Sequence, residues 1–146
     1  MKKIAIAVII IISIPITAYV LFSYHTSANL AFTEQITLTL YSGTFCRDQN
    51  IFIPQIDTVV VTDPNYVQDI VSVIQNGSRW DWLTYPSAAC PFRLTMIFEG
   101  GGRRVYVFPA TDDCPAIFIG GRLFIIDEAS RIALWDNVRK HIDIGW

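Results

Sequence analysis

The pattern most informative about the fold lies in Phe92–Ile126, FRLTMIFEGGGRRVYVFPATDDCPAIFIGGRLFII. Apolar side chains recur at every second position in four short parts of it. This period is typical of β-strands, whose successive side chains point to opposite faces. Because the turns between these parts are short, the four strands are expected to form an antiparallel meander. They are Phe92–Glu99, Arg103–Pro109, Pro115–Ile119 and Arg122–Ile126.

Glycine runs mark two of the reversals. Gly100–Gly102 and Gly120–Gly121 each permit positive φ, which a tight hairpin turn requires. Glu99 lies close to Arg103 and Arg104, and we expect it to be their cross-strand charge partner. The first glycine run precedes a strand rather than a helix, so it is not interpreted as a phosphate-binding loop. One face of the first strand is predicted to carry Phe92, Leu94, Met96 and Phe98.

Two further strands are predicted upstream. In Ile36–Tyr41 the apolar residues alternate with threonines, and Ile56–Thr62 is rich in β-branched residues, which suit a pleated sheet. We expect these two strands to pair as neighbours.

Two helices complete the pattern. Asp63 and Pro64 form a helix start, because the aspartate accepts hydrogen bonds from first-turn N–H groups and proline needs no N–H there. Asn76–Gly77 is expected to end this helix in a left-handed cap. Asp127 is predicted to cap the last helix. The apolar stripes are Val67, Ile70, Val71 and Ile74 in the first helix and Ile132, Trp135, Val138 and Ile142 in the second.

The predicted order is strand, strand, helix, four strands, helix. Amphipathic helices need an apolar surface to cover. The sequence therefore predicts an α+β domain over residues 36–146, an antiparallel sheet with both helices on one face. The part from Ile56 to Ile142 resembles TATA-binding-protein-like folds in its topology. That resemblance implies a fold and no activity.

The N-terminus carries an export signal. Residues 4–22 contain no charge over nineteen positions. About 20 apolar residues span a bilayer as a helix, whereas a cleaved signal peptide needs only about 7–15. Residues 1–24 are therefore predicted to be a transmembrane anchor, and the small and polar residues 25–35 a stalk. A cleaved signal peptide is the alternative, because Pro15 can end the helix early and small residues precede Asn29.

Charges set the expected orientation. Lys2 and Lys3 precede the apolar span, so this end is expected to stay in the cytoplasm. We expect a single-pass protein of the cytoplasmic (inner) membrane with its C-terminal domain outside the cytoplasm, or a secreted or periplasmic domain after cleavage. The membrane is thus one expected partner, through residues 4–22. A formal net charge of -2 and the absence of a basic run argue against nucleic-acid binding.

Two of the three cysteines flank the first glycine-turned hairpin. If this hairpin is centred on Gly102, the numbers of paired residues sum to 204, as those of Cys90 and Cys114 do. In an oxidising compartment we expect a disulfide between them, in preference to free thiols or a metal site. Cys46 lies in a predicted turn. Three roles are open for it: a buried small hydrophobe, an intermolecular disulfide partner or a reactive thiol.

The sequence predicts no catalytic residue, cofactor or metal site. His25 lies in the predicted stalk. His141 lies near a helix end, where its charge complements the helix dipole. Asp112 and Asp113 lack the further spaced acidic residues of a calcium loop and are expected to cap a turn.

Aromatic side chains are concentrated in Ser78–Pro91, a stretch without strand or helix periodicity. Trp80, Trp82 and Tyr85 are the candidate binding residues. They either fill the edge of the core under this predicted loop or project as a platform for a partner.

Around the hairpin, Cys90–Phe92 and Asp112–Cys114 resemble a pattern of small exported bacterial proteins from uncharacterised families. That resemblance implies a bacterial envelope protein and carries over no catalytic residue. Together these features predict a membrane-anchored extracytoplasmic module that binds another envelope protein and is not an enzyme. The alternatives are an exported inhibitor or immunity-type protein and an envelope enzyme.

Overall fold

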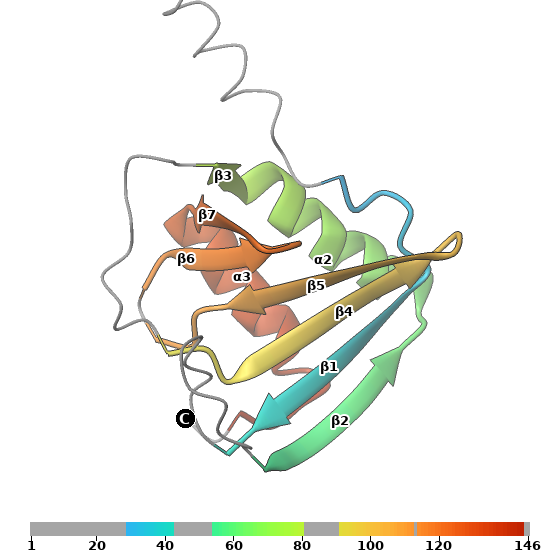
Figure 1. Ribbon diagram of the computed structural model, residues 1–146, viewed down its shortest axis with the longest axis horizontal. Helices are drawn as coiled ribbons and strands as arrows, with labels where there is room; N and C mark the ends of the chain where they lie inside the picture. Colours follow the sequence, from blue (N-terminus) through green and yellow to red (C-terminus); the bar gives the residue numbers. More distant parts are fainter. Residues whose placement is uncertain (1–28, 43–53, 81–90, 113, 145–146) are drawn as a thin grey trace, which may run out of the picture.

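The structure, a computed structural model, describes residues 29–42, 54–80, 91–112 and 114–144. They form one antiparallel sheet of seven strands with two helices (Figure 1). The strand order across the sheet is β2-β1-β4-β5-β6-β7-β3. In chain order the elements are β1 Gln35–Tyr41, β2 Gln55–Val61, α2 Pro64–Gly77, β3 Ser78–Trp80, β4 Leu94–Gly100, β5 Arg103–Pro109, β6 Ala116–Ile119, β7 Arg122–Ile126 and α3 Glu128–Val138.

This architecture confirms the predicted α+β class and the antiparallel sheet. Both helices lie behind the sheet in Figure 1, and their apolar side chains join those of the strands in one core. The predicted pairing of the two upstream strands is also confirmed, as β1 with β2. The sequence does not predict β3, because three residues are too few to show a period. Part of the predicted loop is therefore an edge strand that pairs with β7.

The pairing of β1 with β4 sets the core. Every second side chain of each strand points toward the helices, and these six apolar side chains are at most 2% exposed. Burial of one such side chain contributes roughly 1.5–3 kcal/mol. A slip of one residue would expose all of them, so the register is strongly fixed. The cross-strand pairs are Ile36–Phe98, Leu38–Met96 and Leu40–Leu94.

Phe92 departs from the predicted face of this strand. β4 begins only at Leu94, so the alternation does not extend back to Phe92. The ring of Phe92 instead meets the ring of Phe118 edge-on, with the centroids 5.2 Å apart. The prediction is correct for the other three members of that face, which are Leu94, Met96 and Phe98.

The start of α2 is as predicted, and its end is not. The side chain of Asp63 accepts a hydrogen bond from the N–H of Asn65 over 2.9 Å, and Pro64 occupies the first turn. Gly77 is the last helical residue and has no positive φ, so the predicted left-handed cap is wrong. Its missing side chain serves packing, because a Cβ there would lie 2.1 Å from the Cβ of Ser130 on α3. The predicted stripe is buried: Val67, Ile70, Val71 and Ile74.

Asp127 caps α3 as predicted, since its carboxylate accepts the N–H of Ser130 over 2.9 Å. The predicted stripe of this helix is partly wrong, because Ile132 is 49% exposed. At about 100° per residue, Ile132 lies roughly a third of a turn from the centre of the buried side chains. Ile142 lies beyond the end of the helix and is buried. The buried side chains of α3 are Leu134, Trp135 and Val138.

Both glycine turns have the predicted positive φ. The values are 54° and 73° in Gly101–Gly102 and 56° and 80° in Gly120–Gly121. Two successive positive φ angles are what a type I′ hairpin turn requires. Because Gly100 pairs with Arg103, the first hairpin is centred between Gly101 and Gly102. Paired residue numbers therefore sum to 203, and the predicted centre on Gly102 is displaced by half a residue.

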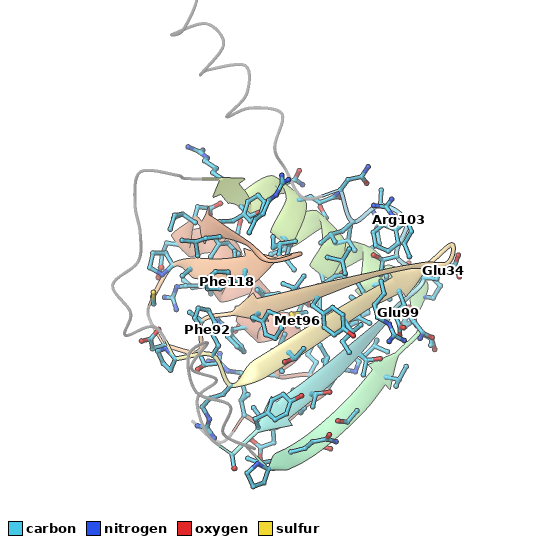
Figure 2. The ribbon with its side chains drawn as sticks, in the orientation of Figure 1. Glu34, Phe92, Met96, Glu99, Arg103 and Phe118 are labelled. Atoms are coloured by element: carbon cyan, nitrogen blue, oxygen red, sulfur yellow. The ribbon has the colours of Figure 1, made fainter. Side chains whose placement is uncertain are left out.

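The segment that leads into β1 packs onto the domain. Leu30 is 1% exposed and belongs to the core. The guanidinium of Arg103 lies over the ring of Phe32, 4.2 Å from its centroid. The N–H of Glu34 donates to the carbonyl of Glu99 over 2.8 Å. The described part of the predicted stalk is therefore held against the β4–β5 hairpin, at the right of Figure 2.

The predicted anchor lies outside the described residues. Neither helix of the described part is long and apolar enough to cross a bilayer. Residues 4–22 are not among those described, so the transmembrane anchor stays a prediction.

Alanine at position 100 tests how closely this segment crosses the hairpin. A Cβ on Gly100 would lie 2.0 Å from the carbonyl oxygen of Phe32 and 2.8 Å from the nitrogen of Glu34, so the backbone must move. We expect Gly100→Ala to lower the free energy of unfolding by about 1–3 kcal/mol, as overpacking does, measured by urea denaturation. Gly102→Asn is the matched control, because a Cβ there meets nothing within 4 Å and asparagine tolerates positive φ. A smaller loss in Gly100→Ala than in the control would contradict this packing.

Candidate functional site

We call the side of the sheet that points away from the helices the open face. Its side chains alternate along each strand with the buried ones, and neither described helix covers it (Figure 1). One row of this face crosses four strands in register. Val60 on β2 pairs with Thr37 on β1, Thr37 pairs with Ile97 on β4, and Ile97 pairs with Tyr106 on β5. We call these four residues the open-face row.

The open-face row ends in exposed apolar side chains. Val60 is 55% exposed and Tyr106 is 44% exposed, whereas Ile97 between them is partly buried. The solvated face of an antiparallel sheet usually carries polar side chains. An apolar row on that face is therefore a candidate contact surface.

A charged row lies next to the open-face row, toward the β4–β5 turn. Gln35 pairs with Glu99, and Glu99 pairs with Arg104. Figure 2 marks the position of Glu99 on β4. Gln35 Nε2 donates to Glu99 Oε2 over 2.9 Å, and Arg104 Nε donates to Glu99 Oε1 over 2.6 Å. The hydrogen bond from Gln35, followed by that from Arg104, holds the pKa of the Glu99 carboxyl below its ordinary value. The charges of this row are thus paired within the face.

Arg104 also links the charged row to the open-face row. Hydrogen bonds to Glu99 and then to Tyr106 raise the pKa of the Arg104 guanidinium. The hydroxyl of Tyr106 therefore takes part in the polar network, while its ring remains part of the apolar row.

A threonine row lies on the other side of the open-face row. Thr58 pairs with Thr39, and Thr39 pairs with Thr95. The hydroxyl of Thr58 donates to that of Thr39 over 3.2 Å. Thr39 and Thr95 are only 7% and 8% exposed. The threonine row therefore adds little exposed surface on β1 and β4. On β2, exposed apolar surface also includes Ile56, which is 56% exposed and lies outside the open-face row.

Of the predicted binding residues, the structure describes only the backbone of Trp80. Trp80 is the last residue of β3, at the register position opposite Phe124 on β7, and β3 is the sheet edge far from β2. Trp82 and Tyr85 lie outside the described residues. Both interpretations of the aromatic segment therefore stay predictions.

Asp112 is a turn cap, as predicted, since its carboxylate accepts the N–H of Cys114 over 2.9 Å. Asp113, His25 and Cys46 lie outside the described residues.

His141 contributes to the contact between α2 and the end of α3. It is exposed beyond the end of α3, and its ring centroid lies 3.9 Å from that of Tyr66. The Tyr66 hydroxyl donates to the carbonyl of Asn137 over 2.8 Å. Burial raises the pKa of Tyr66 well above its ordinary value. These contacts attach the end of α3 to the start of α2.

Val60, Ile97 and Tyr106 are not among the candidate residues predicted from the sequence. Each lies in a correctly predicted strand, at the phase opposite to the core, and is large and apolar. This opposite phase is the signal in the sequence that could have identified the three residues. Only the pairing of strands distant in the chain shows that the three belong to one row.

Neither comparison with known proteins nor the grouping of potential metal ligands among the described residues indicates a function. Within the described ranges, no three His, Cys, Asp or Glu side chains are grouped so that they could hold a metal ion. The chain matches no protein-family model, no curated protein and no solved structure. The open face is therefore interpreted from its own geometry.

The charged row gives a prediction about pH. Because the hydrogen bond from Gln35 is the first cause of the lowered pKa of Glu99, we expect Gln35→Leu to raise that pKa toward its ordinary value. A carboxyl with a lowered pKa stabilises the fold above the pKa of the unfolded chain, and this contribution is lost as pH falls through the folded-state pKa. A carbon-13 NMR titration of the Glu99 carboxyl measures the change. An unchanged pKa in the variant would show that Gln35 is not its cause.

The predicted disulfide remains compatible with the β4–β5 hairpin after the centre of that hairpin is shifted by half a residue. The carbonyl of Pro91 accepts the N–H and the hydroxyl of Thr111, over 2.8 Å and 3.0 Å, so the chain beside both cysteines is held together. Cys114 is not a free thiol. Cys90 lies outside the described residues, so the pairing of Cys90 with Cys114 stays a prediction.

Peptide mapping without reductant should recover Cys90 joined to Cys114 and leave Cys46 open to alkylation after unfolding. Replacing both bridged cysteines with serine should cost about 3 kcal/mol of unfolding free energy, because the bridge restricts the unfolded chain. A bridge that includes Cys46 would refute the pairing.

Proposed function

We propose that this chain is a membrane-anchored extracytoplasmic domain that binds another protein of the bacterial envelope through the open face of its sheet. The observation that carries the proposal is the open-face row. Val60 and Tyr106 stand about half exposed at the two ends of one continuous cross-strand row. The neighbouring charged row has its charges paired internally.

The physical character of this surface supports binding. Its backbone is fixed by strand pairing on both sides of β1 and β4, so association has to order only a few side chains. Tyr106 offers a large amphipathic ring with little rotamer freedom to lose. The row of Gln35, Glu99 and Arg104 would form part of a polar rim around the apolar contact.

The proposed anchor would determine how far the open face lies from the membrane. Residues 4–22 would span the membrane, with Lys2 and Lys3 on the cytoplasmic side. Leu30 is already part of the core, so residues 23–29 separate the domain from the span. Seven residues reach at most about 25 Å. The domain would therefore act close to the membrane, on partners that are held there too.

Photo-crosslinking in cells tests the binding surface. A photoreactive amino acid at position 106 or 60 of the full chain should form covalent adducts with protein. The same amino acid at position 132 is the matched control, because Ile132 is 49% exposed but lies on α3, on the other side of the sheet. The adducts should remain in the membrane fraction after a high-salt wash.

Two outcomes would contradict parts of this proposal. Adducts at position 132 without adducts at positions 60 and 106 would place binding on the helical side. A soluble product that begins near Asn29 would remove the anchor and leave the open face as the binding surface.

A further inference from the structure

We propose that the partner of the open face is the open face of a second copy of this chain, in a two-fold symmetric dimer within one membrane. The inference rests on the proposed function of the open face, and it makes the envelope partner a second molecule of this same chain.

The charges of the face permit self-association. Two copies of one surface carry the same charges, so a surface with an excess of one sign repels its own copy. Glu99 and Arg104 form an ion pair within the charged row, and Gln35 binds the same carboxylate. The residues of the open-face row are uncharged. A partner of strongly positive or negative charge would find no net charge here to bind.

The position of the N-terminal segment determines which direction of the two-fold axis is compatible with two anchors in one membrane. The segment lies beside the β4–β5 turn, where the N–H of Gly101 donates to Glu34 Oε1 over 3.2 Å and Arg103 lies over Phe32 (Figure 2). Two anchors in one membrane require these turn ends to lie on the same side of the dimer. An axis along the strands meets this requirement. An axis across the strands would place the two turns at opposite ends.

This axis specifies which residues meet. If it runs between β1 and β4, the open-face row of one copy faces the reversed row of the other. Tyr106 then lies against Val60 of the second copy, and Ile97 against its Thr37. An aromatic ring against a β-branched side chain is a favourable contact between sheets and strands. In the charged row, Gln35 would come opposite Glu99 of the second copy.

The size of the surface indicates how strong the dimer is. Four strands at about 4.8 Å give a width of roughly 19 Å, and the open-face row with the charged row, each about 7 Å deep along the strands, gives a length of roughly 14 Å. The threonine row adds little, because Thr39 and Thr95 are already buried. Each copy thus contributes on the order of 250–300 Å², about 500–600 Å² in total, which is well below the roughly 1,200–2,000 Å² of stable interfaces. The dimer is therefore weak in dilute solution. Anchoring in one membrane raises the effective concentration of the second copy and populates it.

Cysteine crosslinking in membranes tests this geometry. Full-length chains with Val60→Cys and with Tyr106→Cys are expressed together and oxidised with copper phenanthroline. The mixed pair should give several-fold more disulfide dimer than either variant alone, because position 106 would lie about 14 Å across the sheet from its own symmetry mate. Ile132→Cys controls for exposure, and the unsubstituted chain controls for the native cysteines.

Each outcome decides the proposal. A mixed-pair yield no higher than that of Ile132→Cys would overturn the dimer. More dimer from Tyr106→Cys alone than from the mixed pair would overturn the axis along the strands. Photo-crosslinks from position 106 to a different protein, without a mixed-pair dimer, would refute the second copy and leave the proposed function standing. Absence of any adduct would refute both. Because both positions are half exposed, a melting temperature near that of the unsubstituted chain should confirm that the variants fold.

Discussion

The register between β1 and β4 determines which side chains of the central strands enter the core and which face solvent. The two strands bring their apolar phases to one face, where Ile36, Leu38 and Leu40 meet the buried side chains of β4. Because the side-chain period of a strand is two, a slip of one residue would turn these side chains to solvent and bring threonines into the core. The helices α2 and α3 pack against the face that this register buries. The same register aligns Thr37 with Ile97, so the open-face row is a consequence of how the core is built.

The N-terminal segment connects this core to the proposed anchor. Leu30 is buried, and Phe32 packs against the core and under Arg103. The segment crosses the hairpin at Gly100, the residue whose missing side chain leaves room for it. A flexible stalk would allow the domain any orientation over the membrane. The docked segment keeps Phe32 and Glu34 beside the β4–β5 turn, and the proposed dimer axis is chosen from that placement.

Local signals in the sequence predict local structure well. The bounds of β5 and β7 agree with the predicted strands, and both aspartate caps are where the residue types placed them. The order of the strands in the sheet is harder to predict from such local signals. Nothing in the local pattern shows that β1 lies between β2 and β4, or that β3 extends the far edge of the sheet. Gly77 suggested a helix cap, yet it is needed for a contact with Ser130 that is distant in the chain. The open-face row was beyond prediction for the same reason, since its four residues come from four strands.

Native-state hydrogen exchange tests whether the β1–β4 pairing is the most stable part of the sheet. The amides of Thr39 and Thr95 point across the β1–β4 pair, because they follow the same alternation as Tyr41, whose N–H donates to the carbonyl of Arg93 over 2.9 Å. They should exchange only through global unfolding, with the highest protection in the domain. Amides of the edge strand β2, such as that of Val59, should exchange faster through local opening. Protection in β1 that is no higher than in β2 would show that the β1–β4 pairing is not the centre of the fold.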